Sequence, residues 1–200
     1  MKPSLKIGPL INLQDARYSA AAGFDVVSFS LERGSDRKLS VSMIWNMVQW
    51  LSGPEIALEM NVASLEELSE ANDTFSYHWI TLPAAEWDER VWQHTPAGVV
   101  LRADAGFDPD HLAGMLLQAK DAGREMRIEL FSDAAGNFLP YDDFAGHCFL
   151  HFPSLDALGA AIPFLKIAPM GFALGLEAEE EPGVLHYERI DELLEQAGYA

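Results

Sequence analysis

Residues 6–29 read KIGPLINLQDARYSAAAGFDVVSF, and this stretch indicates the fold class. A short apolar run is followed by a helical segment over Leu13–Ala22 and then by a second apolar run. Asn12 precedes the helical segment and is a favoured N-cap residue, while Gly23 follows it and is a favoured stop. The order strand, capped helix, strand predicts a β/α unit whose two strands lie parallel.

The same pattern recurs to the end of the chain. Apolar runs of strand length alternate with helical segments, and the runs lack the polar alternation of a strand with one solvated face. We therefore expect strands that are buried on both faces. The eight predicted strands are Leu5–Ile7, Asp25–Ser30, Glu55–Met60, Tyr77–Thr81, Gly98–Arg102, Met126–Phe131, His147–His151 and Met170–Leu174.

Eight β/α units in 200 residues predict an α/β fold, a single compact (β/α)₈ TIM barrel that spans residues 1–200 as one domain. The helical units after the fourth and sixth strands are expected to be short or irregular. The stretch Ser64-Leu65-Glu66-Glu67 has the spacing of a capping box, so the Ser64 side chain is expected to cap a helix. A doubly wound open sheet is the alternative, but no Gly-rich dinucleotide fingerprint follows the first strand.

The composition narrows the range of partners. Thirty-one acidic residues against thirteen Lys and Arg give a net charge of −18. This field repels nucleic acids and anionic membranes, so we expect neither as a partner. The single cysteine, Cys148, allows no internal disulfide. No apolar run approaches the ~20 residues of a membrane-spanning helix and no secretion signal opens the chain, which predicts a cytoplasmic protein. The oligomeric state is not indicated.

Common cofactor motifs are absent from the sequence. It contains no Walker loop, no nucleotide fingerprint and no Ser-His-Asp order, so no cofactor is expected. His147 and His151 lie on a predicted strand, where residues four apart are separated by ~13 Å. That distance is too long for one ion, so no zinc site is expected.

Both ends of the chain resemble the phosphoribosylanthranilate isomerase family of tryptophan biosynthesis. Residues 6–40, KIGPLINLQDARYSAAAGFDVVSFSLERGSDRKLS, are similar to the family's opening K-I-C-G-I-T-N-L-E-D-A and its later S-P-R-Y-V-S. Residues 171–194, GFALGLEAEEEPGVLHYERIDELL, resemble the family's ending, G-V-D-V-S-S-G-V-E and then P-G before K-I. The resemblance implies the same barrel and an intramolecular aldose–ketose isomerase as ancestor.

The family's catalytic pattern is changed in this chain. By resemblance, a cysteine after the first strand acts as general base in an Amadori rearrangement, and an aspartate at the end of the sixth strand acts as general acid. The cysteine position is Gly8 here, which has no side chain to accept a proton. Phe131 aligns with the aspartate, and Asp133 lies two residues further on. Asp133 is a candidate catalytic acid, with the capping of its own loop as the alternative.

The family's phosphate loops also differ. Its L-A-G-G-L after the seventh strand corresponds to Leu150–Ser154, which contains Pro153, a residue without an N–H. Its S-S-G after the eighth strand corresponds to Gly175-Leu176-Glu177, which would place a carboxylate where phosphate binds. The aspartate of its V-D-V is Ala173. We expect the phosphate site to be lost.

Several polar residues remain as candidates for ligand binding. Arg37 matches an arginine that contacts the anthranilate carboxylate in the family, and arginine suits a planar carboxylate. Glu59, Arg102 and Glu129 lie at predicted strand ends, together with His151, where barrels build their sites. These groups could bind a polar ligand, or they could form a buried ion-pair network that fills the barrel.

Three functions follow from this pattern. The first is a barrel that has lost the usual isomerisation and acts as a module that binds a small molecule or a protein. The second is an isomerase of phosphoribosylanthranilate or a related substrate, with relocated carboxylates Asp133, Glu129 or Glu59 as acid and base. The third is a protein that binds or transforms a small, non-phosphorylated carboxylate held by Arg37. Whether the chain is an enzyme stays open at this level.

Overall fold

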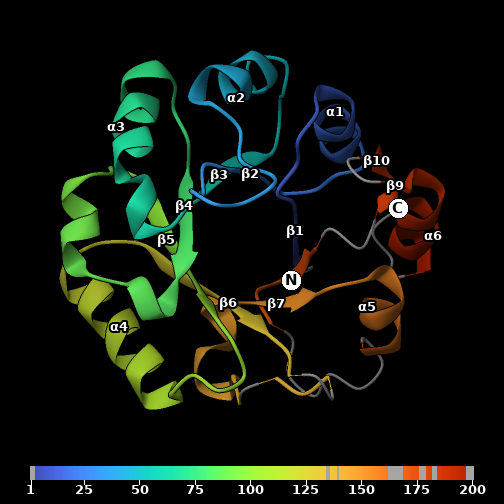
Figure 1. Cartoon of the computed structure of the whole chain (residues 1–200). Helices are drawn as coiled ribbons and strands as arrows, with labels where there is room; N and C mark the ends of the chain where they lie inside the picture. Colours follow the sequence, from blue (N-terminus) through green and yellow to red (C-terminus); the bar gives the residue numbers. More distant parts are fainter. Residues whose placement is uncertain are drawn as a thin grey trace.

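A computed structural model describes residues 3–133, 136–138, 140–161, 169–175, 179–181 and 184–196. Eight parallel strands close into a barrel in the order of the chain, with helices around them (Figure 1). This architecture confirms the predicted (β/α)₈ barrel. The strands are β1 (Ser4–Ile7), β2 (Val26–Ser30), β3 (Glu55–Glu59), β4 (Trp79–Pro83), β5 (Gly98–Ala103), β6 (Met126–Phe131), β7 (Cys148–Phe152) and β8 (Gly171–Leu174).

Helices of unequal length cover the strands. The α-helices are α1 (Leu13–Ala21), α2 (Val41–Val48), α3 (Leu65–Thr74), α4 (Pro109–Asp121), α5 (Leu155–Ala161) and α6 (Tyr187–Gln196). The 3₁₀ turns are η1 (Val62–Ser64), η2 (Ala84–Glu86), η3 (Glu89–Gln93) and η4 (Asp142–His147). A small antiparallel pair, β9 (Glu179–Glu181) and β10 (Val184–Leu185), precedes α6. Since β4 is followed only by η2 and η3, and β6 only by η4 in its described part, the prediction of irregular units there is confirmed.

The helix starts follow from capping residues. Asn12 accepts a hydrogen bond from the Asp15 amide at 2.8 Å, as its position before α1 predicts. Asp108 caps α4 in the same way, with Pro109 in the first turn.

The predicted capping box at Ser64 is wrong. The Ser64 hydroxyl donates to Asn61 Oδ1 at 2.7 Å and accepts from the Arg33 amide at 2.8 Å, and it makes no cap hydrogen bond to α3. The Ser64 hydroxyl therefore forms a tertiary contact with the loop after β2, and not the hydrogen bond to the helix that the local pattern predicted.

The interior of the barrel has an apolar lower layer. It consists of Val26, Ala57, Trp79, Val100, Phe149 and Ala173. The guanidinium of Arg127 lies 3.6 Å from the centre of the Trp79 ring, and the indole Nε1 donates to Glu55 at 2.6 Å. These contacts close the amino-terminal end of the barrel.

Polar residues occupy the layer above. Because side chains alternate along a strand, residues two positions further on point into the next layer. In this way Val26 is followed by Ser28, Ala57 by Glu59, Val100 by Arg102 and Phe149 by His151. The polar layer faces the carboxyl ends of the strands, where barrels carry their sites.

Among the helices in the described part of the chain, none is long and apolar enough to span a bilayer.

Candidate functional site

A cavity of about 310 Å³ opens at the carboxyl ends of the strands. We call it the mouth pocket. Its volume lies at the small end of the ~300–1,000 Å³ found for ligand sites. Its lining residues are Gly8, Pro9, Ser30, Glu32, Ser35, Asp36, Arg37, Glu59, Arg102, Glu129, Phe131, His151, Pro153 and Gly175. The structure therefore brings Glu59, Arg102 and Glu129 from the ends of their strands to one place, together with Arg37 from the loop after β2.

Gly8 stands at the floor of this pocket with a backbone φ of +136°. This is a region that residues with a side chain rarely adopt. A Cβ at this position would lie 2.3 Å from Ser28 Oγ and 2.7 Å from the Ser28 carbonyl oxygen. The Leu10 amide donates to the same carbonyl at 2.8 Å, which holds the turn after β1 against β2. Position 8 is thus built for glycine.

Lys6 and Glu129 form a buried ion pair beneath the pocket. Lys6 Nζ lies 2.5 Å from Glu129 Oε2, and the two side chains are 4% and 2% exposed. Burial alone would raise the pKa of Glu129, but the Lys6 ammonium and the hydrogen bond with His151 outweigh it and hold that pKa below its ordinary value. Burial would lower the pKa of Lys6, and the charges of Glu129 and Glu59 raise it instead. Both groups are held in their charged forms.

His151 shares the second oxygen of the same carboxylate. Its Nδ1 lies 2.8 Å from Glu129 Oε1. Its ring stacks on Phe131, with ring centres 4.0 Å apart. Both rings line the mouth pocket, so this part of the polar layer faces the cavity.

A second set of ion pairs surrounds Glu59. This carboxylate accepts from Ser28 Oγ at 2.7 Å and lies 3.4 Å from Lys6 Nζ and 3.5 Å from an Arg102 nitrogen. Arg102 also lies 2.8 Å from Glu32. Glu59, Arg102 and Glu129 thus take part in a network of ion pairs, one of the two alternatives open from the sequence, and Lys6 and Glu32 complete it.

Arg37 and Asp133 differ in their positions. Arg37 lines the mouth pocket, and its guanidinium donates to the Pro9 carbonyl at 3.3 Å. Asp133 is exposed and is not among the lining residues. Its carboxylate accepts from the Asn137 amide at 2.8 Å and closes the turn of its own loop. A catalytic role for Asp133 stays a prediction, as does ligand binding by Arg37.

The loop after β7 has the predicted proline at the mouth. Pro153 and Gly175 both line the pocket. The Gly175 amide is already used, because it donates to the Phe152 carbonyl at 3.0 Å. Ala173 lies inside the barrel, in the apolar layer. Glu177, which was predicted to occupy the phosphate position, lies outside the described residues.

Sequence reasoning missed Lys6 and Glu32. Lys6 is a charged residue within an apolar strand, two positions before Gly8, so it points to the same side of β1 as Gly8. This alternation of side chains along the strand could have identified Lys6 as a residue of the barrel interior. Glu32 follows β2 in a charged loop, and only the contact with Arg102 identifies it.

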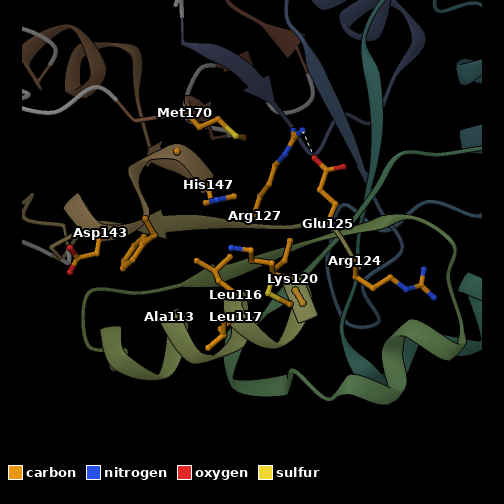
Figure 2. Close-up of a pocket in the computed structure, with 14 residues that line it drawn as sticks. Ala113, Leu116, Leu117, Lys120, Arg124, Glu125, Arg127, Asp143, His147 and Met170 are labelled. Carbon is orange, nitrogen blue, oxygen red and sulfur yellow. Dashed lines mark hydrogen bonds and ion pairs between the residues drawn. The ribbon is translucent and has the colours of Figure 1, made fainter. Parts of the chain in front are cut away.

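A larger hollow, of about 690 Å³, lies outside the barrel between α4 and η4. Figure 2 shows Leu116, Leu117 and Lys120 of α4 along one wall, with His147 and Met170 on the opposite side. Since its strand residues lie at the beginnings of β6 and β8, this groove is at the end of the barrel opposite to the mouth pocket.

Fold and site together define the class of protein: a (β/α)₈ barrel with one charged pocket at the carboxyl ends of its strands. Neither a protein-family model nor a curated protein matches the sequence. Solved structures do match.

Phosphoribosylanthranilate isomerase from Thermotoga maritima matches with a TM-score of 0.79 and 17% identity, over 99% of this chain and 100% of that one. TrpF from Jonesia denitrificans gives 0.73 and 17%, over 98% and 97% of the two chains. The tryptophan synthase alpha chain from Legionella pneumophila gives 0.67 and 14%, over 98% and 91%. These likenesses confirm the phosphoribosylanthranilate isomerase fold that the two ends of the sequence predicted.

Proposed function

We propose that this chain is a phosphoribosylanthranilate isomerase-like barrel that does not carry out the family's isomerisation, and that it binds a small, non-phosphorylated carboxylate in its mouth pocket. The observation that carries the proposal is the backbone at Gly8. The site of the family's general base has a positive φ and leaves no room for a Cβ. A general base contributes about 10²–10⁴-fold to a rate, so its loss is severe.

The acid side of the reaction is equally unsupported. A general acid must carry a proton near neutral pH, which requires a raised pKa for a carboxyl group. The pKa of Glu129 is lowered instead, because Lys6 and His151 stabilise its ionised form against the effect of burial. This favours a binding function over an isomerase that uses Glu129 as its acid.

The charge of the pocket disfavours a phosphate. Four carboxylates line it, against the two guanidinium groups of Arg37 and Arg102. One of the similar isomerases is in complex with reduced 1-(o-carboxyphenylamino)-1-deoxyribulose 5-phosphate, a ligand with both a carboxylate and a phosphate. For this chain we retain only the carboxylate, since a phosphate monoester carries more negative charge, and each like charge at 4 Å near a protein surface costs about 4 kcal/mol.

Arg37 is the proposed carboxylate partner. It lines the pocket on the side of Gly8 and Pro9, where no side chain from position 8 competes for space. Arginine can hold a carboxylate through two parallel hydrogen bonds, and charge-assisted bonds of this kind contribute about 1.5–3 kcal/mol.

Calorimetric titration with anthranilate and with ribose 5-phosphate tests this function. We expect anthranilate to bind more tightly than ribose 5-phosphate, and Arg37→Gln to weaken anthranilate binding about 10- to 100-fold. Arg33→Gln is the matched control, because Arg33 lies on the same loop but pairs with Glu67 outside the pocket. Tighter binding of ribose 5-phosphate, or equal effects of the two substitutions, would overturn the proposal.

A further inference from the structure

The pair of Glu129 and His151 has a geometry beyond what ligand binding needs. Glu129 is 2% exposed and uses Oε2 for Lys6 and Oε1 for His151 Nδ1. A carboxylate fixed in this way places the ring proton of a neutral imidazole on Nδ1. The lone pair then resides on Nε2, the atom that accepts protons when histidine acts as a base.

The ring lies at the wall of the mouth pocket, with its Nε2 edge beside Gly175. Phe131 stacks on one face of the imidazole with an interplanar angle of 19°. A Cβ built on Gly175 would lie 2.8 Å from Nε2, so this edge of the ring faces a residue without a side chain. Among the residues that the structure describes, none forms a hydrogen bond with Nε2. His151, Gly175 and Arg37 all line the mouth pocket.

We propose that His151, oriented by Glu129, is a general base that acts on a small 2-oxo carboxylate in the mouth pocket. The inference rests on the proposed function, because Arg37 holds the carboxylate of the substrate. A base aligned by a third group is the arrangement that activates proton transfer in many enzymes. The pocket, of about 310 Å³, has room for a small 2-oxo acid beside Arg37.

The chemical step is a proton transfer that balances without an oxidant or a reductant. Nε2 takes a proton from the carbon next to the carbonyl, and the electron pair of the broken C–H bond forms a C=C bond. The carbonyl π pair moves to oxygen as an enolate, and Arg102, which also lines the pocket, is a cation that can stabilise it. In D₂O the proton on Nε2 exchanges with solvent, and the return of a deuteron from Nε2 to carbon restores the 2-oxo acid with one C–D bond.

Proton exchange of pyruvate and 2-oxobutyrate in D₂O, followed by NMR, tests the activity. We expect the full chain to accelerate exchange of at least one of them, and His151→Gln to remove about 10²-fold or more of that acceleration. Gly175→Ala should also reduce it, because the added methyl meets Nε2 at 2.8 Å while Glu129 and Lys6 stay in place. Absence of acceleration for both acids, or full activity of His151→Gln, would overturn the inference.

Chemical modification separates the two proposals. Diethyl pyrocarbonate should modify His151 of the unaltered protein at least as fast as exposed His111, and Glu129→Gln should slow only His151. If His151 reacts and added anthranilate does not protect it, ligand binding at the mouth is refuted, while the role of His151 as a base is not. Anthranilate binding together with an unreactive His151 would refute the base alone. Circular dichroism of each variant shows whether it is folded.

Discussion

Replacing Gly8 by alanine tests whether the base position can carry any side chain. Two effects add in the structure. An ordinary residue at φ +136° is strained, which costs about 1–3 kcal/mol. The added Cβ also lies 2.3 Å from Ser28 Oγ and 2.7 Å from the Ser28 carbonyl oxygen, and overpacking of this kind costs about 1–3 kcal/mol. We therefore expect Gly8→Ala to lower the free energy of unfolding by about 2–6 kcal/mol.

The assay is urea denaturation followed by circular dichroism, supported by thermal unfolding. For a chain of this length, about 2–4 °C is lost per kcal/mol, so the Tm should fall by roughly 5–20 °C. Gly53→Ala is the control, because Gly53 has a φ of +111° and no neighbour within 4 Å of its Cβ position. It isolates the backbone contribution. Adding Ser28→Ala to Gly8→Ala should restore only part of the loss, because the carbonyl contact remains.

Equal destabilisation by Gly8→Ala and Gly53→Ala would refute the steric part of this reasoning. Unchanged stability of Gly8→Ala would refute it entirely and would make a side chain at position 8 feasible. A functional consequence follows from the same geometry. We expect Gly8→Cys to unfold more easily and not to acquire isomerase activity.

Three further predictions concern the interior of the barrel. Lys6→Met should lower the free energy of unfolding in urea titrations by about 3–5 kcal/mol, because Glu129 would be left buried without Lys6. Adding Glu129→Gln should recover part of this loss. Strictly additive losses from the two substitutions would contradict the coupling of the two residues. The stability from this pair should be present between pH 4.5 and 10.5, and it should be lost as the pH falls below 4.5 or rises above 10.5, since folding lowers the pKa of Glu129 and raises that of Lys6. The same pH dependence in the doubly substituted chain would show that other groups cause it. Trp79→Phe should cost about 1–2 kcal/mol through loss of the hydrogen bond to Glu55, whereas an unchanged urea midpoint would mean that this bond contributes nothing.

Most of the fold could be predicted from the sequence because local signals and the barrel agree. Each predicted strand overlaps an observed one, and the cap at Asn12 is formed as predicted. The boundaries were less exact. Strand β4 was predicted from Tyr77 but spans Trp79–Pro83, although the His78 amide already donates to the Ile56 carbonyl at 2.9 Å.

The candidate site was only partly predictable. Strand ends point to Glu59, Arg102 and Glu129, since parallel strands of a barrel deliver their last residues to one mouth. Their partners were not visible in the same way. The contact between Arg102 and Glu32 joins residues 70 positions apart, and the orientation of His151 depends on Phe131 and Gly175. Pairing across the barrel is set by three-dimensional packing, which a local pattern does not encode.

The central claim is that this barrel has the phosphoribosylanthranilate isomerase fold without the isomerisation. The most direct test is the turnover of freshly generated phosphoribosylanthranilate, followed by its fluorescence, with the unaltered chain beside Asp133→Asn and His151→Gln. We expect the uncatalysed rate in all three samples. Turnover well above that rate by the unaltered chain would show that the barrel is an active isomerase, and its loss in Asp133→Asn or His151→Gln would identify the group that replaced the missing base or acid.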